Sequence, residues 1–162
     1  MQNNEMLSTM KHIKSTNQSL PEQVAALRLR AKLTPEQAAA VDIRALERFL
    51  SSPLAEEMRR VAAMEREYRF TVLMDARDYD GMSVGGDEIL LQGVVDCWFD
   101  GLEGITVLDF KSDRIRPGGE AARGEEYRPQ LEAYSRALER ITGRRVAHRI
   151  LWFFATGTGL EL

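Results

Sequence analysis

The sequence predicts an α/β domain with a small mixed central sheet of about four strands flanked by helices. Two changes of pattern along the chain indicate this class. Apolar residues recur at helical spacing in the first third of the chain, and apolar strand-like runs follow between residues 68 and 111. A further helical stretch then precedes one more apolar run. This order of helices, three strands, a helix and a strand is typical of a sheet covered by helices.

We expect the N-terminal part, residues 1–62, to be a helical region. Apolar residues lie at helical spacing between positions 24 and 50. The segment Thr34-Pro35-Glu36-Gln37 has the pattern of a helix start, with an N-cap, a proline in the first turn and a capping box. Ser52-Pro53 begins a short helix that we expect to reach about Ala62.

Residues 63–162 are expected to form the α/β core of a single domain that spans 1–162. We predict strands over Tyr68–Met74, Glu88–Phe99, Ile105–Lys111 and Val146–Ala155, a helix over about Glu125–Ile141 that ends at Gly143, loops over Asp78–Asp87 and Arg114–Gly124, and turns over 100–104 and 156–159. The third strand is apolar on both faces until it reaches Asp109, which is typical of a strand inside a covered sheet.

Composition bounds the function classes. The chain has 162 residues, of which 44% are hydrophobic and 29% charged, so one compact domain fits. No apolar run approaches the roughly 20 residues that span a bilayer, and the start lacks the apolar core of a secretory signal. We therefore expect a cytoplasmic protein. The single cysteine, Cys97, excludes an internal disulfide and a multi-cysteine metal site, and we expect it to be a buried structural thiol.

The net charge of −3 argues against a protein that grips nucleic acid unaided, because phosphate neutralisation dominates that affinity. It is compatible with a site that concentrates carboxylates.

Asp96, Asp109 and Lys111 form the clearest chemical pattern. A turn centred between Leu102 and Glu103 would place Asp96 directly opposite Asp109. Opposed residues of a hairpin point to the same face, with Cβ atoms about 5 Å apart. Lys111 is two residues beyond Asp109 and shares that face. A register slip of one residue would separate the three side chains.

Two carboxylates at that distance repel one another, and a divalent cation relieves the repulsion. Hard oxygen ligands with open water positions suit Mg²⁺ or Mn²⁺. Such an ion lowers the pKa of a bound water and neutralises charge at a phosphate, and Lys111 could position the water or stabilise the developing charge. The pattern therefore indicates phosphodiester hydrolysis. The alternative, a solvated Asp–Lys pair on a strand surface, stays open from these residues alone.

Three motifs in order carry a resemblance to a known family. They are Gly93-Val94-Val95-Asp96, Leu108-Asp109-Phe110-Lys111-Ser112-Asp113, and Tyr127-x-x-Gln130-Leu131-x-x-Tyr134. This combination resembles the RecB-like nucleases of the PD-(D/E)xK superfamily, which have the restriction-endonuclease-like fold. Within that family it is most similar to the C-terminal nuclease domain of AddA-type polypeptides in bacterial AddAB (RexAB) helicase–nucleases. Arg66-Glu67-Tyr68-Arg69-Phe70 and Phe49-Leu50-x-x-Pro53-Leu54 are also similar, so the resemblance covers almost the whole chain.

The resemblance implies a role for each matching residue. Asp96, Asp109 and the backbone carbonyl of Phe110 become ligands of Mg²⁺ or Mn²⁺, Lys111 becomes the catalytic lysine, and Gln130 and Tyr134 match the family's Gln-x-x-x-Tyr motif. Tyr127, Gln130 and Tyr134 fall on one helix face, where the tyrosines either contact DNA or pack in the core. Glu67 either orients the site or forms an ion pair at the strand edge.

One departure concerns the family's Gly-x-x-x-His motif, whose histidine binds metal. The matching stretch falls around Asn4 to Leu7, where there is no histidine, and His12 matches a later position that is not a ligand. Either the chain is a fragment that begins after the motif, or the histidine is lost. We treat 1–162 as a fragment of a longer helicase–nuclease.

The resemblance also implies partners. The chain lacks a Gly-x-x-x-x-Gly-Lys-Ser/Thr loop and so has no ATPase motor of its own. In the family, helicase domains precede the nuclease on the same polypeptide, deliver single-stranded DNA to it, and work with an AddB-like partner subunit. Candidate phosphate contacts, against ordinary solvated loop residues, are Arg114, Arg116, Arg123 and Arg128.

Three functional hypotheses follow. The first is a Mg²⁺-dependent DNA exonuclease domain of an ATP-dependent helicase–nuclease in double-strand break repair and recombination. The second is a catalytically silent module that guides DNA or docks a partner subunit, which the missing histidine favours. The third is a metal nuclease of the same fold that acts alone, which the net charge disfavours.

Overall fold

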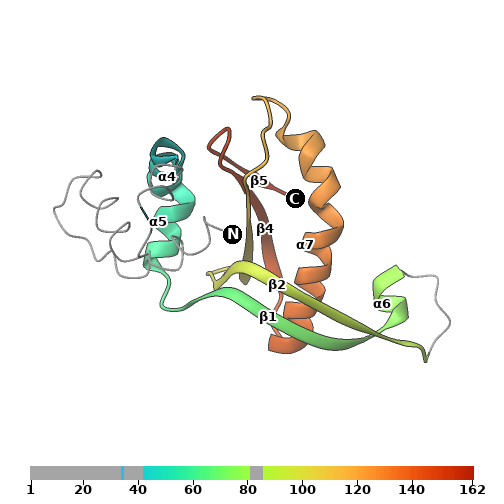
Figure 1. The fold of residues 1–162 in the computed structure, drawn as a ribbon. Helices are drawn as coiled ribbons and strands as arrows, with labels where there is room; N and C mark the ends of the chain where they lie inside the picture. Colours follow the sequence, from blue (N-terminus) through green and yellow to red (C-terminus); the bar gives the residue numbers. More distant parts are fainter. Residues whose placement is uncertain (1–33, 35–41, 81–85) are drawn as a thin grey trace.

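The computed structural model describes residue 34 and residues 42–80 and 86–162 (Figure 1). Their elements, in chain order, are α4 (Ile43–Leu50), α5 (Pro53–Arg60), β1 (Met64–Asp75), α6 (Ala76–Asp80), β2 (Glu88–Asp100), β3 (Ile105–Lys111), α7 (Glu120–Thr142), β4 (Val146–Phe153) and β5 (Thr158–Glu161). The helix predicted after Thr34, the stretch from Asn4 to Leu7 and His12 lie outside the described residues. No helix in the described ranges is long and apolar enough to cross a membrane.

The strands form one mixed sheet in the order β1-β2-β3-β4-β5. β1 with β2, β2 with β3, and β4 with β5 are antiparallel, whereas β3 and β4 are parallel and are joined through α7. The predicted α/β class with a mixed sheet is confirmed. The expected number of about four strands is too low, because Thr158–Glu161 pairs with β4 instead of lying wholly in a turn.

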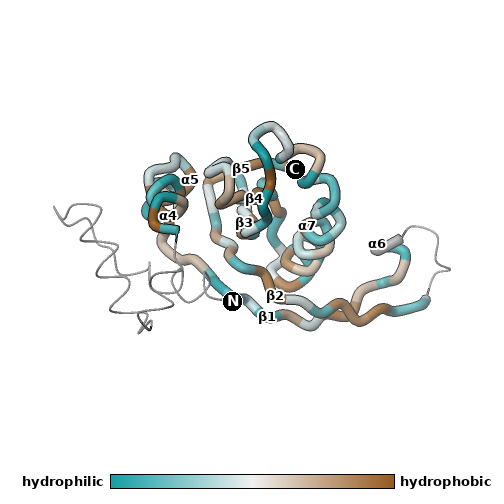
Figure 2. Tube along the Cα trace, turned by 45° about the horizontal axis from the view of Figure 1, so that its top comes forward, coloured by the Kyte–Doolittle hydropathy of each residue, from teal (hydrophilic) through white to brown (hydrophobic). Residues whose placement is uncertain are grey.

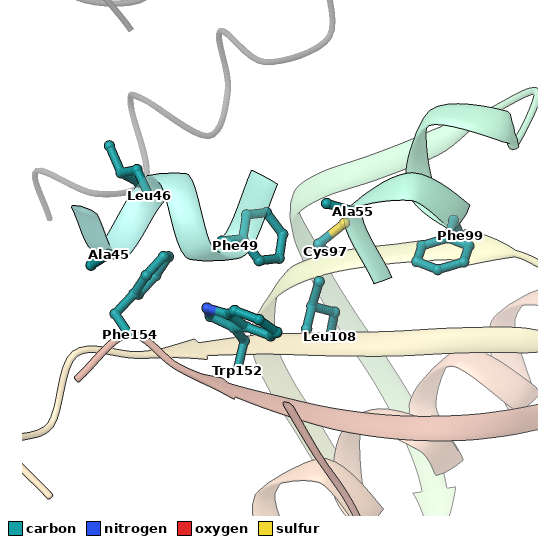
Figure 3. Close-up of a cluster of buried hydrophobic side chains, with 9 residues drawn as sticks. All are labelled: Ala45, Leu46, Phe49, Ala55, Cys97, Phe99, Leu108, Trp152 and Phe154. Carbon is teal, nitrogen blue, oxygen red and sulfur yellow. The ribbon is translucent and has the colours of Figure 1, made fainter. Parts of the chain in front are cut away.

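Helices cover both faces of the sheet: α4 and α5 lie on one side and α7 on the other (Figure 1). On the α4–α5 side, an apolar cluster joins Phe49 of α4 to Trp152 and Phe154 at the end of β4 (Figure 3). Cys97 is fully buried in this cluster, as expected of a structural thiol. On the other side, Ala137 and Leu138 of α7 pack against apolar side chains of the first three strands.

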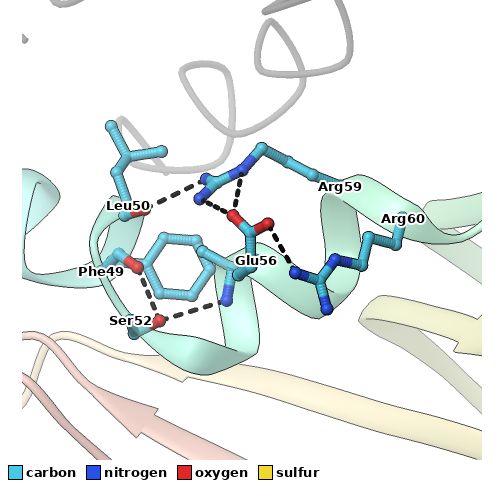
Figure 4. Close-up of polar contacts among 7 residues, drawn as sticks. Phe49, Leu50, Ser52, Glu56, Arg59 and Arg60 are labelled. Atoms are coloured by element: carbon cyan, nitrogen blue, oxygen red, sulfur yellow. Dashed lines mark hydrogen bonds and ion pairs between the residues drawn. The ribbon is translucent and has the colours of Figure 1, made fainter. Parts of the chain in front are cut away.

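Capping interactions fix the corner between α4 and α5 (Figure 4). The Ser52 hydroxyl accepts a hydrogen bond from the Ala55 amide at 3.1 Å and donates one to the Phe49 carbonyl at 2.6 Å. Pro53 follows at the start of α5, as the sequence predicted. Arg59 bridges Glu56 and the Leu50 carbonyl across the same corner. The corner therefore holds Phe49 against the sheet.

β1 and β2 continue as a two-stranded ribbon beyond α7 (Figures 1 and 2). Leu73 and Leu90 are paired across this ribbon and are 54% and 57% exposed. β1 begins at Met64, before the predicted start at Tyr68. The loop predicted over 78–87 begins with the last turn of α6.

α7 begins at Glu120, before the predicted start at Glu125. Gly119 stands at its N-cap and supplies no side-chain capping bond, so the usual sequence signal is missing. The predicted end is confirmed: Gly143 adopts the left-handed conformation with φ 69°. Gly124 lies so close to β5 that a Cβ atom there would be 2.2 Å from Cδ2 of Leu160. This approach brings α7 down onto the sheet beside the end of β3.

Candidate active site

β3 divides its side chains between the two faces of the sheet. Leu108 belongs to the apolar cluster under α4 and Phe110 packs against it, whereas Asp109 and Lys111 alternate with them and point toward α7. Asp109 is only 3% exposed, and its Oδ2 lies 2.5 Å from Lys111 Nζ. The predicted sharing of one face by Asp109 and Lys111 is therefore confirmed.

The hairpin register confirms the predicted turn but ends one residue short of the site. β2 and β3 pair from Asp100–Ile105 to Cys97–Leu108, as a turn between Leu102 and Glu103 requires. The predicted direct pairing of Asp96 with Asp109 does not form. The Asp96 Oδ2 atom instead accepts a hydrogen bond from the Phe110 amide at 2.9 Å. The Phe110 amide would otherwise have donated the next backbone hydrogen bond of the β2–β3 ladder, and it donates to the Asp96 carboxylate instead.

The ladder on the other side of Asp96 is interrupted as well. The pairs Arg66–Cys97 and Tyr68–Val95 flank the missing pair between Glu67 and Asp96. Glu67 has φ 48° and is the only non-glycine residue with positive φ in the described ranges. Such backbone costs roughly 1–3 kcal/mol and tends to persist at functional sites. Glu67 thus lies beside Asp96, and its charge contributes to raising the pKa of Asp96.

Burial disfavours charge on both aspartates. Burial raises the pKa of Asp109 to about 6, and the Asp96 carboxylate adds to the rise, while Lys111 opposes it. Burial also raises the pKa of Asp96, and the hydrogen bond from the Phe110 amide opposes that change. Two partly desolvated carboxylates that repel one another form a place where a cation gains electrostatic energy.

The donor atoms fit a hard divalent cation. Asp109 Oδ2 is buried and has no well-aligned hydrogen-bond donor in the described part of the chain, despite the close ammonium of Lys111. The Lys111 carbonyl accepts from Phe154 on the β4 side, so the preceding carbonyl, that of Phe110, faces β2 together with its own amide. Two carboxylates and a carbonyl are oxygen ligands of the kind that Mg²⁺ prefers. Within residues 42–80 and 86–162, no group of three His, Cys, Asp or Glu side chains is arranged to hold a metal.

α7 supplies the groups around the lysine. Lys111 Nζ donates to Gln130 Oε1 at 3.1 Å, and Gln130 Nε2 donates to the Tyr134 hydroxyl at 2.7 Å. The Tyr127 ring centre lies 3.8 Å from Lys111 Nζ. The prediction that these three α7 residues share one face is thus confirmed. Tyr134 also packs against Phe70, with ring centres 5.8 Å apart, so it has a core-packing role too.

The four candidate arginines fall into two pairs. Arg123 is held by Asp113, Glu126 and the Tyr127 hydroxyl, and Arg128 pairs with Glu125. Arg114 and Arg116 are exposed and form no ion pair in the described part of the chain. These two loop arginines are therefore free to contact a phosphate.

Two features of the site escaped sequence reasoning. Asp113 accepts hydrogen bonds from the Tyr127 hydroxyl at 2.6 Å and from Arg123, which ties the end of β3 to α7. The second feature is the scarcity of lysine: only four of the 22 basic residues are lysines, and Lys111 is the only one in the described ranges. In a chain that otherwise uses arginine, an isolated lysine beside a buried aspartate was an available signal.

Comparison with known proteins assigns the chain to a family. The model of the PD-(D/E)XK nuclease superfamily matches residues 5–159. The chain belongs to the PD-(D/E)XK nuclease superfamily. Its mixed five-stranded sheet between helices is consistent with the restriction-endonuclease-like fold of this superfamily, which confirms the predicted fold class.

Relatives of this PD-(D/E)XK chain include several proteins whose names describe them as A-type subunits of an ATP-dependent helicase/nuclease. The chain is 34% identical to that of Acetivibrio thermocellus over 152 residues, which are 91% of this chain and 12% of the relative. It is 38% identical to that of Moorella thermoacetica over 152 residues, which are 91% of this chain and 10% of the relative. The chain thus spans about an eighth or less of the length of these relatives.

Proposed function

We propose that this chain is a metal-dependent DNA nuclease domain that hydrolyses phosphodiester bonds. The observation that carries the proposal is the buried Asp109 carboxylate beside Lys111, with Asp96 and the Phe110 backbone at the same point of the sheet. The pKa values of both aspartates are raised even though Lys111 is close. A further positive charge, such as a metal ion, would therefore be stabilised at this site.

Each residue receives a role from its contacts. Asp96, Asp109 and the Phe110 carbonyl would hold Mg²⁺ or Mn²⁺, which supplies charge neutralisation at the phosphate and a water of lowered pKa. Lys111 orients the attacking water or stabilises the charge that develops on the phosphate. Gln130, itself held by Tyr134, fixes the Lys111 ammonium. Glu67 orients the site from the neighbouring strand.

The names of the relatives support a wider setting. We infer that the domain belongs to a longer ATP-dependent helicase–nuclease that acts as a DNA exonuclease in double-strand break repair and recombination. A helicase motor would deliver single-stranded DNA to the site, and an AddB-like partner would complete the complex. Arg114 and Arg116 would contact the phosphate backbone beside the site. We expect a protein with this substrate to act in the cytoplasm.

A second candidate is a catalytically silent module that guides DNA or docks a partner protein. It is favoured by the small number of metal-binding side chains gathered in the described residues. The nuclease proposal is preferred because a silent module has no need to keep a buried, poorly solvated Asp109 next to a lysine.

Cleavage of linear DNA by the protein with Mg²⁺ or Mn²⁺ tests the proposal. We expect Asp109→Ala to reduce cleavage by at least about 10²–10³-fold, the magnitude seen when one preorganised electrostatic group is removed from an active site. Asp100→Ala is the matched control: Asp100 lies on β2, outside the site, and pairs with Arg144 at the surface. It should cut as fast as the unmodified protein.

Circular dichroism should show that both variants keep the fold. If Asp109→Ala cut DNA as fast as the unmodified protein, the site assignment would be wrong. If the unmodified protein bound DNA but failed to cut it with either ion, the silent module would be the better description.

A further inference from the structure

The Lys111 ammonium is enclosed by groups from two elements. Asp109 of β3 lies 2.5 Å from Nζ, and Gln130 of α7 accepts a hydrogen bond from it at 3.1 Å. The third neighbour is the ring of Tyr127, whose centre lies 3.8 Å from Nζ. The Lys111 side chain is therefore only 12% exposed.

The Tyr127 ring is itself held in place. Its hydroxyl donates to Asp113 Oδ2 at 2.6 Å and accepts from Arg123 Nη2 at 3.0 Å. Arg123 also donates to Asp113 at 3.2 Å. The three groups form a closed triangle that joins the end of β3 to the second turn of α7. Such a closed set restricts rotation of the ring about its own side-chain torsions.

A lysine needs this kind of restraint more than most side chains do. Its ammonium is a compact charge at the end of a flexible four-carbon stem, which carries about 2 kcal/mol of rotamer entropy. An aromatic face attracts the ammonium without offering it a competing carboxylate. The ring thus adds a third contact to those that the ammonium makes with Asp109 and Gln130.

We propose that Tyr127 is a positioning residue for Lys111, and that its ring, anchored by Asp113 and Arg123, holds the ammonium beside Asp109. This inference rests on the proposed nuclease function for its catalytic consequence, but its structural content does not. The sequence left both a DNA contact and core packing open for Tyr127; the inference adds a third role, in which Asp113 and Arg123 engage its hydroxyl. In this proposal Arg123 holds the Tyr127 ring and does not bind a phosphate.

Nuclear magnetic resonance of the lysine ε-methylene groups tests the position of Lys111 without any need for activity. The 162-residue chain has only four lysines, so a sample labelled with ¹³C at the ε carbons gives few signals, and Lys111→Met identifies the one of interest. A methylene beside an aromatic face is displaced upfield by the ring current. We expect Tyr127→Phe, which keeps the ring but loses the anchoring hydroxyl, to reduce this displacement, and Tyr127→Leu to abolish it.

Cleavage kinetics supply the second readout. We expect Tyr127→Leu to lower kcat by about tenfold, the effect of losing a desolvated cation–π contact, with KM changed less than about twofold. Tyr127→Phe should rescue kcat in part, because the ring remains but its anchoring hydroxyl is lost. A loss of packing alone would lower the stability of Tyr127→Leu without this split between kcat and KM.

Asp113→Asn is a second variant, useful if Tyr127→Leu does not fold. It keeps the ring but weakens its anchor, so the upfield displacement should shrink without vanishing. An unchanged Lys111 signal in Tyr127→Leu, or in Asp113→Asn where the leucine variant is unfolded, would overturn the inference whatever the cleavage rates. Absence of cleavage in the unmodified protein would instead overturn the proposed function and leave the resonance result to judge the position of Lys111.

Discussion

The two faces of β3 differ in character: one packs in an apolar cluster, and the other carries a buried carboxylate and a lysine. Toward α4, Leu108 and Phe110 meet a dry cluster in which the Phe49 ring lies 5.0 Å from that of Trp152 and 5.2 Å from that of Phe110. Toward α7, Asp109 and Lys111 are almost as deeply buried but are charged. The apolar face gains free energy from burial, and the charged face loses it.

This contrast indicates how the site is tolerated. The buried Asp109 carboxylate, with its raised pKa, is carried on a strand whose opposite face packs in the apolar cluster under α4. The scaffold face should therefore control stability, and the charged face should control chemistry at some expense of stability.

Truncation of the scaffold face should give the largest change in stability. Phe49 is fully buried and its ring contacts three other aromatic rings. We expect Phe49→Ala to lower the free energy of unfolding by about 3–5 kcal/mol, the usual cost of removing a buried phenylalanine. Urea denaturation measures this change. The cleavage rate per folded molecule should stay within about twofold of the unmodified rate, and a loss as large as that of Asp109→Ala would break the comparison.

Neutralisation of the charged face should stabilise the protein. The pKa of Asp109 is raised to about 6 from its ordinary value of 3.8, so the folded protein binds this proton more tightly than the unfolded chain does. The favourable contribution of the protonated group is complete below about pH 4 and is lost as the pH rises through about 6. Asp109→Asn removes that loss, and we expect it to raise the free energy of unfolding at pH 8 by on the order of 2 kcal/mol.

This pH effect is measured by urea denaturation in the presence of EDTA at pH 4 and pH 8. The difference between Asp109→Asn and the unmodified protein should be small at pH 4 and should grow toward pH 8. Equal stabilities at pH 8 would mean that Lys111 compensates the buried charge fully, and the contrast between the two faces would then disappear.

The corner that seats Phe49 should give the smallest of these effects. Ser52 is 8% exposed and caps α5 through the Ala55 amide. We expect Ser52→Ala to cost about 1 kcal/mol in the free energy of unfolding, the typical value for the loss of an N-cap. Thermal unfolding measures it, with the α4 cap variant Asp42→Ala as the matched comparison. Cleavage by both variants should equal that of the unmodified protein, and a reduced rate would show that the corner reaches the site.

Local patterns were sufficient to predict much of the sheet. The turn after Asp100 fixed the register of β2 with β3, and apolar runs located β3 and β4. β5 was missed because its four residues include a glycine and gain their order from pairing with β4. The start of α7 was missed because Gly119 provides no capping side chain. The division into a helical region, 1–62, and a core, 63–162, stays a prediction.

The gathering of several candidate side chains was predictable from the sequence, but their geometry was not. Alternation along β3 placed Asp109 with Lys111, and helical spacing placed Gln130 with Tyr127. The hydrogen bond from the Phe110 amide to Asp96 forms because the Asp96 side chain competes with the β2 backbone for that amide. The positive φ of Glu67 coincides with the missing pair between β1 and β2 at Asp96. The spacing of residues in the sequence predicts neither this hydrogen bond nor the positive φ of Glu67.

The connection between β3 and β4 has a consequence for the order of folding. The β1–β2 and β2–β3 pairs are hairpins and close over short stretches of chain, whereas the parallel β3–β4 pair must wait until the whole of α7 has been traversed. Contacts of such long sequence separation form late because loop closure costs entropy before it is rewarded. Lys111 contacts Gln130 only after α7 has packed against the sheet. We therefore expect the hairpin that carries Asp96 and Asp109 to form before the surroundings of Lys111 are complete.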